Sequence, residues 1–305
     1  RVSSLASIPF QFNSDYFDFD TDIIIQLLDV KSRIEEIPIP TFYGEEISRV
    51  NSIRYGLLIL ATTAQSRIMR WGIFYHPKFD YEGKTVRYPL KTGYPSSHQF
   101  ALQRVEKGMN VLDISADASP LAGEFAGRGI KAVHWTGESP VWDSKIPRPD
   151  RILLLDVLEH LKSPEQFLLA LQHRFCRESP TVVVTSGNIA FILLRLALLA
   201  GYFNYSKRGI LDLSHIRLFT FQSMRRLLEH HGFEVLEEEG IPAPFPLALG
   251  PGLAGKLLLR LNLWLMTLSR PLFSFQMAFV AKPRPTLEVL LENAFAAGHQ
   301  KRGED

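Results

Sequence analysis

Short apolar segments alternate with amphipathic segments between Tyr94 and Pro283, and this alternation predicts strands separated by helices. Helices are predicted to begin near Leu121, Ser163 and Phe221. The apolar segments that are short enough to be strands are 110–114, 131–136, 151–155, 180–186 and 233–237. This order predicts a doubly wound α/β sheet that is mostly parallel, with residues 273–280 as an antiparallel edge strand.

A different pattern occupies the first 76 residues. Acidic and aromatic residues at 14–22 lead into a predicted helix from Ile23 to Ser32, and a long amphipathic helix is predicted over 46–71. Between them, residues 34–41 alternate Ile with Glu and end in prolines, which predicts an edge strand. The acids at 14–22 either cap the helix and complement its dipole or position a substrate hydroxyl group.

Residues 77–93 separate these two patterns. They contain two prolines and two glycines with charged residues between them, a composition typical of linkers. The sequence therefore predicts a small, mainly helical domain over 1–76, a linker over 77–93 and an α/β domain over 94–305.

The composition indicates a globular chain. It has 305 residues, 46% of them hydrophobic, and a formal net charge of +2, so it can bury a large core and shows no basic excess that would indicate nucleic-acid binding. Its single cysteine, Cys176, excludes an internal disulfide and a cysteine-rich zinc site, which favours a reducing, cytoplasmic location. The chain begins at Arg1 without an initiator Met, so we expect a piece of a longer protein.

Three apolar helical stretches carry a basic residue within or beside them: Tyr55–Ala64, Phe191–Phe203 and Lys256–Leu268. None contains the roughly 20 uninterrupted apolar residues of a membrane span. They are either core helices or helices that lie in a membrane interface with their basic groups toward anionic headgroups. The second alternative would make the protein peripherally membrane-associated.

Two strands end in acids, and the residues around them carry a family resemblance. Val111-Leu112-Asp113, followed by the segment from Leu153 to Leu161, resembles the first and fourth strands of class I S-adenosylmethionine-dependent methyltransferases. The resemblance implies a Rossmann-like sheet and S-adenosylmethionine as the cofactor. It also implies that Asp113 and Asp156 lie at the cofactor site.

The loop after Asp113 departs from the family pattern. Ser115, Asp117 and Ser119 stand where the family has glycines, whose missing Cβ lets the backbone approach the cofactor. The second strand ends without an acid, and the nearest carboxylate is that of Glu138. The cofactor-binding candidates are thus Asp113, Ser115, Asp117, Glu138 and Asp156, and we expect S-adenosylmethionine binding to be weak or lost.

Catalytic candidates follow the fourth strand of the resemblance. Glu159 and His160 either act as a general base or cap the next helix. His215, with Arg217, either binds an anionic acceptor or makes hydrogen bonds within its loop. No metal site is expected, because no second ligand follows at helical spacing.

The first 80 residues resemble the C-terminal end of the catalytic domain of family 2 glycosyltransferases of the dolichyl-phosphate-sugar synthase type. Phe19-Asp20-Thr21-Asp22-Ile23 and the segment from Glu36 to Gly44 carry this likeness. Two functions remain open: a methyltransferase acting on a glycan or lipid-linked saccharide, and a non-catalytic binding or scaffolding domain attached to a polyprenyl-phosphate glycosyltransferase. The sequence leaves the oligomeric state open.

Overall fold

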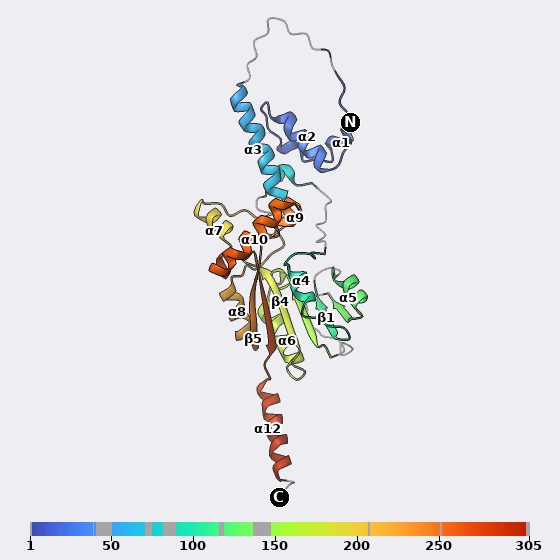
Figure 1. Ribbon diagram of the computed structural model, residues 1–305, viewed down its shortest axis with the longest axis vertical. Helices are drawn as coiled ribbons and strands as arrows, with labels where there is room; N and C mark the ends of the chain where they lie inside the picture. Colours follow the sequence, from blue (N-terminus) through green and yellow to red (C-terminus); the bar gives the residue numbers. More distant parts are fainter. Residues whose placement is uncertain are drawn as a thin grey trace. The chain divides into compact units, whose positions relative to one another are not determined.

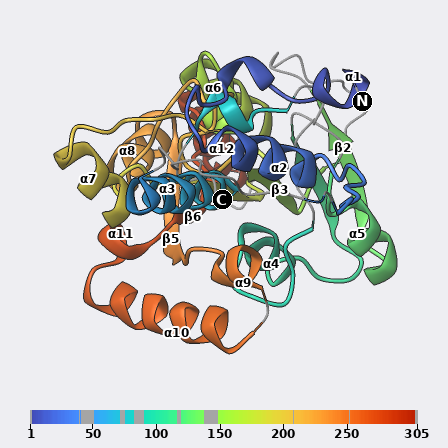
Figure 2. The same ribbon diagram turned by 90° about the horizontal axis from the view of Figure 1, so that it is seen from above.

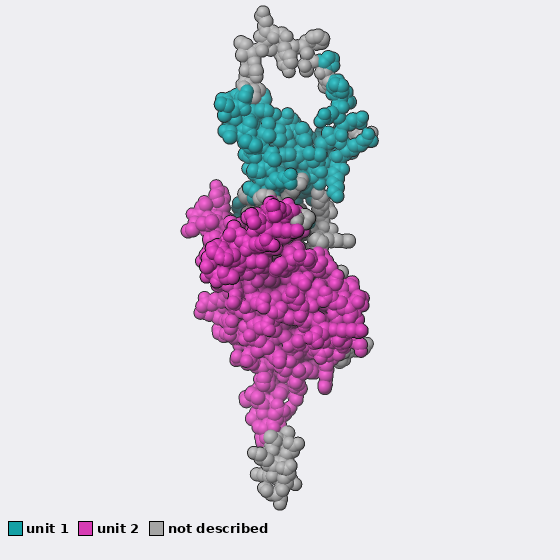
Figure 3. All heavy atoms as spheres, in the orientation of Figure 1, with its two compact units in different colours: residues 1–87, 204–213 teal, residues 88–203, 214–305 magenta. Residues whose placement is uncertain are grey.

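The computed structural model describes residues 2–38, 40, 51–70, 75–81, 90–115, 119–136, 148–206, 208–250 and 252–302. The chain forms two compact units, which Figure 3 colours separately. Unit 1 comprises residues 1–87 and 204–213, and unit 2 comprises residues 88–203 and 214–305.

Unit 2 is built on a six-stranded sheet in the order β2-β1-β3-β4-β6-β5 (Figure 1). The first four strands in this order are parallel, and β6 is antiparallel to both of its neighbours. Residues 111–114 of β1 pair in parallel with residues 151–154 of β3, which confirms the predicted mixed α/β sheet and the pairing of its two acid-ended strands. The strands are β1 (Asn110–Ile114), β2 (Lys131–Trp135), β3 (Arg151–Leu155), β4 (Thr181–Gly187), β5 (Phe233–Ile241) and β6 (Gln276–Pro283).

The predicted position of the antiparallel strand at the sheet edge is wrong. β6 lies between β4 and β5, and β5 is the edge strand. The side chains explain this order, since β6 carries a continuous buried run from Met277 to Ala281, as an interior strand with both faces covered requires. β5 carries four glutamates, which an edge strand can expose to water.

Helices cover both faces of this sheet. Leu112 and Ile114 pack with α6 (Pro164–Phe175) and α8 (Phe221–His230), whereas the alternate residue Val111 packs with α4 (Ser97–Leu102) and α5 (Ala122–Arg128). The remaining helices of unit 2 are η3 (Leu158–His160), α7 (Ile192–Leu199), α9 (Phe245–Leu249), α10 (Leu253–Leu268), α11 (Arg270–Phe273) and α12 (Leu287–Arg302). Among the described residues, no helix is long and apolar enough to cross a membrane.

The described part of unit 1 contains helices but no strand. Residues 34–38 have no regular structure, so the predicted edge strand is wrong there. Proline at 38 and 40 removes backbone donors, and the described residues of this unit offer no neighbouring strand to pair with. The helices are α1 (Val2–Leu5), η1 (Phe10–Phe12), α2 (Phe19–Asp29), α3 (Ser52–Arg70) and η2 (Pro77–Phe79).

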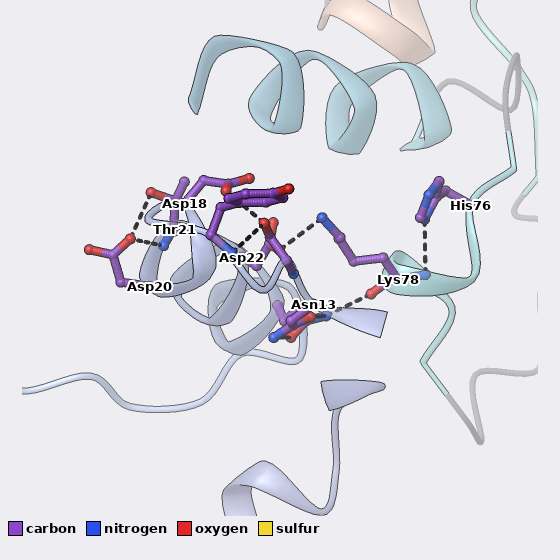
Figure 4. Close-up of polar contacts among 10 residues, drawn as sticks. Asn13, Asp18, Asp20, Thr21, Asp22, His76 and Lys78 are labelled. Carbon is purple, nitrogen blue, oxygen red and sulfur yellow. Dashed lines mark hydrogen bonds and ion pairs between the residues drawn. The ribbon is translucent and has the colours of Figure 1, made fainter. Parts of the chain in front are cut away.

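A buried polar cluster joins η2 to α2 (Figure 4). The Lys78 ammonium lies 2.8 Å from a carboxylate oxygen of Asp22, which is fully buried in the first turn of α2. The Ser14 backbone N–H donates to the same oxygen at 2.8 Å, and Gln26 Nε2 donates to the Lys78 carbonyl at 2.8 Å. Phe79 adds an apolar contact to this unit, so the segment that follows His76 is packed into unit 1.

Candidate functional site at the carboxyl edge of the sheet

The carboxyl ends of β1, β3 and β4 meet at one edge of the sheet, where α/β proteins bind their ligands. Because β6 runs antiparallel, it contributes its first residue, Gln276, to this edge. Each of the four strands places a polar residue at or just beyond this edge: Asp113, Asp156, Ser186 and Gln276.

Asp156 follows β3 and is held from two neighbouring strands. The Thr185 hydroxyl donates to its Oδ1 at 2.8 Å, and Gln276 Nε2 lies 2.9 Å from both carboxylate oxygens. The backbone of Asp156 has φ 54°, a left-handed conformation that is uncommon outside glycine. Such a conformation persists only where the surroundings fix it, as these hydrogen bonds do.

Glu159 is a buried acid one turn further on, in η3. The Gly187 N–H donates weakly to its Oε1 at 3.4 Å, whereas Oε2 is buried without a hydrogen-bond partner among the described residues. Burial, and then the negative charge of Asp156, raise the pKa of Glu159 to about 8, although hydrogen bonding at the end of β4 opposes the shift. At neutral pH this side chain is therefore mainly a protonated acid that can donate a hydrogen bond.

The structure brings His160 and His215 together next to Glu159. The ring centroids of the two histidines are 4.8 Å apart in an edge-to-face arrangement, and His160 Nδ1 lies 3.2 Å from the Ser214 carbonyl oxygen. The Glu159 carbonyl oxygen accepts from the backbone N–H groups of Ile216 and Arg217 at 2.8 and 3.0 Å. The two histidines therefore lie side by side, and the backbone of Glu159 holds the chain segment that follows His215.

The β1 end of the edge is organised differently, because its side chains bond to one another. The Ser119 hydroxyl donates to Asp113 Oδ2, and Ser115 Oγ lies 2.7 Å from His134 Nε2 on β2. Burial raises the pKa of Asp113, while the Ser119 hydrogen bond and the nearby His134 lower it. The other two cofactor-binding candidates, Asp117 and Glu138, lie outside the described residues.

The sequence analysis missed His98, a buried residue of α4. Its Nδ1 accepts a hydrogen bond from the Lys91 backbone N–H at 2.9 Å. Burial, and then the charge of Lys91, lower its pKa to about 4, against the opposing charge of Asp156. A histidine directly after two serines at a helix start was the only hint of this residue in the sequence. The sequence did not indicate that α4 would lie near Asp156.

Six hydroxyl and carboxyl oxygens of unit 2 are buried without a hydrogen-bond partner among the described residues: Tyr94 Oη, Ser97 Oγ, Glu159 Oε2, Glu178 Oε2, Ser186 Oγ and Ser274 Oγ. Buried polar groups are normally bonded, so such groups call for an explanation. Within the described parts of the chain, no three His, Cys, Asp or Glu side chains are grouped to hold a metal ion. A pocket lined by Lys107, Asp150 and Glu178 lies instead at the amino ends of β1, β3 and β4.

A family model described as a methyltransferase domain matches residues 87–238, just under half of the chain. The match spans β1 to β4 and the Asp156–His160 segment. This region is methyltransferase-like. No curated protein matches the chain.

Solved structures similar to the methyltransferase-like region have low sequence identity to it. An S-adenosylmethionine-dependent methyltransferase from Archaeoglobus fulgidus is 15% identical, with a TM-score of 0.36 over 61% of this chain and 91% of that one. The 1,6-didemethyltoxoflavin-N1-methyltransferase of Burkholderia thailandensis, solved with S-adenosylhomocysteine, is 12% identical, with a TM-score of 0.38 over 62% of this chain and 76% of that one. At these TM-scores the fold assignment depends on the sheet order and the family model.

Proposed function

We propose that this chain is a methyltransferase-like protein of glycan or lipid-linked saccharide metabolism in which S-adenosylmethionine binds weakly. The observation that carries the proposal is the pairing within the β1 loop, where Ser119 bonds to Asp113 and Ser115 bonds to His134. These side chains stand where the resemblance implies a bare glycine backbone open to the cofactor. The described residues therefore do not fit the cofactor in the family manner, and we derive no reaction step through it.

The expected weakening of S-adenosylmethionine binding can be calculated from the hydrogen bond between Ser119 and Asp113. A hydrogen bond to a charged group contributes about 1.5–3 kcal/mol, and a ligand that needs the acceptor position of Asp113 Oδ2 that Ser119 occupies must first replace this hydrogen bond. At about 1.4 kcal/mol per factor of ten, this competition alone weakens binding about ten- to hundred-fold. It moves a micromolar ligand toward the millimolar range.

The β3 side of the edge supports a retained binding role. His160 and His215 lie together after β3, and the buried carboxyl of the neighbouring residue Glu159 has one oxygen without a partner among the described residues. A neutral carboxylic acid and two imidazoles can donate hydrogen bonds to the hydroxyl or phosphate oxygens of a saccharide derivative. This cluster also supports the second candidate function, a non-catalytic binding or scaffolding domain, since it needs no cofactor to bind such a ligand.

The saccharide part of the proposal comes from the resemblance of the first 80 residues to the end of a glycosyltransferase catalytic domain. The acids of that segment have structural partners in unit 1, as the Asp22–Lys78 pair illustrates. We therefore assign no sugar transfer to them. The resemblance of this segment is used only to propose the metabolic setting of the protein.

Titration calorimetry with S-adenosylhomocysteine tests the cofactor proposal. The unmodified chain should bind weakly or not at all, and the triple variant Ser115→Gly, Asp117→Gly, Ser119→Gly should bind at least ten-fold more tightly. The matched control is Ser7→Gly, which removes an exposed serine hydroxyl from unit 1 and should change nothing. Low-micromolar binding by the unmodified chain would overturn the proposal and identify the protein as a working S-adenosylmethionine enzyme.

A further inference from the structure

Helix α10 exposes an apolar face. Leu258 and Leu263 are 36% and 37% exposed and lie elsewhere on the helix, whereas its five most exposed large side chains follow one another at intervals of three or four residues, which places them on one side. They are Leu253, Leu257, Leu261, Trp264 and Leu268. In a water-soluble amphipathic helix this face would be turned toward the core.

The opposite side of α10 is fixed to unit 2. Gly255 and Asn262 are its buried residues. Asn262 Oδ1 accepts from the Ala243 N–H at 2.9 Å, and its Nδ2 donates to the Phe273 carbonyl oxygen at 2.8 Å. A Cβ at Gly255 would lie 2.6 Å from the Gly250 carbonyl oxygen, so the helix sits too close to tolerate a larger residue there. The leucines are therefore held outward, and Figure 2 shows α10 at the periphery.

The chain segment that contains this face carries charges of one sign. No Asp or Glu occurs between Glu239 and Glu288 in the sequence. Lys256 and Arg260 are exposed one turn apart on α10, at the flank of the apolar face. An outward apolar face flanked by lysine and arginine, with a tryptophan within it, is the pattern of helices that lie in the interface of an anionic membrane.

We propose that α10 is a membrane-docking helix that inserts its apolar face into a bilayer containing anionic lipids. Its 16 residues, at about 1.5 Å per residue, are too short to span a bilayer, so the helix lies in the plane of the interface. Lys256 and Arg260 then meet the lipid phosphates while the leucines enter the acyl boundary. This surface does not depend on cofactor binding at the sheet edge.

Co-sedimentation with lipid vesicles tests the proposal on the whole chain. The unmodified protein should bind vesicles of mixed phosphatidylcholine and phosphatidylserine more tightly than vesicles of phosphatidylcholine alone, and added salt should weaken the binding. Lys256→Gln with Arg260→Gln should reduce binding to the anionic vesicles about twenty- to thirty-fold, at about five-fold for each basic residue. Trp264→Phe should abolish the fluorescence blue shift that vesicles cause.

A matched pair of double variants distinguishes specific binding through the apolar face of α10 from non-specific binding by any exposed leucines. Leu257→Glu with Leu261→Glu changes leucines that are 64% and 48% exposed on α10, and should reduce binding more than ten-fold. Leu287→Glu with Leu291→Glu changes leucines that are 72% and 48% exposed on α12, with the same spacing, and should leave binding unchanged. Circular dichroism checks that both variants fold.

Three results would overturn the proposal. The first is equal binding to neutral and anionic vesicles, and the second is an equal loss of binding in the α12 control. The third is a lipid-free dimer, detected by light scattering, that the Leu257→Glu, Leu261→Glu variant converts to monomer, because α10 would then be covered by a second copy of this chain.

Discussion

Replacing Glu159 by glutamine should change how the stability of unit 2 depends on pH. The Glu159 carboxyl has a pKa of about 8 in the folded protein, against an ordinary value of 4.5. Between these two pH values the folded state keeps a proton that the unfolded state has released, so stability falls as pH rises. At 1.36 kcal/mol per pH unit, the loss across the whole window is on the order of 5 kcal/mol.

His98 changes the pH dependence of stability in the opposite direction, and it does so at lower pH. Its pKa falls to about 4 from an ordinary 6.5, so between these values the unfolded state binds the extra proton and stability rises with pH. The two slopes nearly cancel between pH 4.5 and 6.5. From pH 6.5 to 8 Glu159 acts without this opposition, and the unmodified protein should lose about 2 kcal/mol.

Urea unfolding at pH 4.5, 6.5 and 8 measures these slopes. Glu159→Gln should be flat from pH 6.5 to 8 and should gain stability from pH 4.5 to 6.5, where His98 is no longer opposed. His98→Gln should lose stability over the whole range. Glu165→Gln, a partly exposed carboxylate on α6, is the control and should follow the unmodified protein. If Glu159→Gln keeps the unmodified slope above pH 6.5, the burial argument for Glu159 is refuted.

Three further substitutions test the packing, each measured as a change in the free energy of unfolding. Gly240→Ala should destabilise unit 2 by about 1–3 kcal/mol, because its Cβ would lie 2.0 Å from Oγ of the buried Ser274. Lys78→Met should destabilise unit 1 by about 3–5 kcal/mol, since it leaves the buried Asp22 carboxylate without its cation, and hydrogen exchange in α2 would report it. Thr220→Ala should cost about 1 kcal/mol by removing the capping box of α8. Changes below about 0.5 kcal/mol would contradict these reasons.

Local patterns predicted β1, β3 and β4 because each of these strands is a short apolar run with a polar residue at or just after its end. Asp113 and Asp156 could be assigned to one edge, since parallel neighbouring strands end on the same side of a sheet. The order of the last two strands could not be predicted in this way. It depends on which strand is covered on both faces, and the side chains carry that signal: β6 has a continuous apolar run, whereas β5 has four glutamates.

The site residues that the sequence analysis missed come from elements outside the acid-ended strands. Gln276 reaches Asp156 only because β6 is antiparallel and therefore begins, rather than ends, at the ligand edge. His98 belongs to a helix whose position over the sheet is a tertiary property. The failed strand at 34–38 shows the converse limit, since an alternating pattern forms no strand where the described part of the unit offers no partner strand.

The unpartnered oxygen of Glu159 bears on what the sheet edge still does. Glu159 Oε2 is buried without a hydrogen-bond partner among the described residues, while the Ser186 hydroxyl and the Gly187 N–H at the end of β4 stabilise the charged form of the carboxyl. The β1 side of the same edge shows the alternative, because Ser119 and Ser115 satisfy their neighbours internally. Under the proposed function, the β1 side is the part of this edge where cofactor binding is weakened, and recognition of a second molecule at the β3 side does not depend on it.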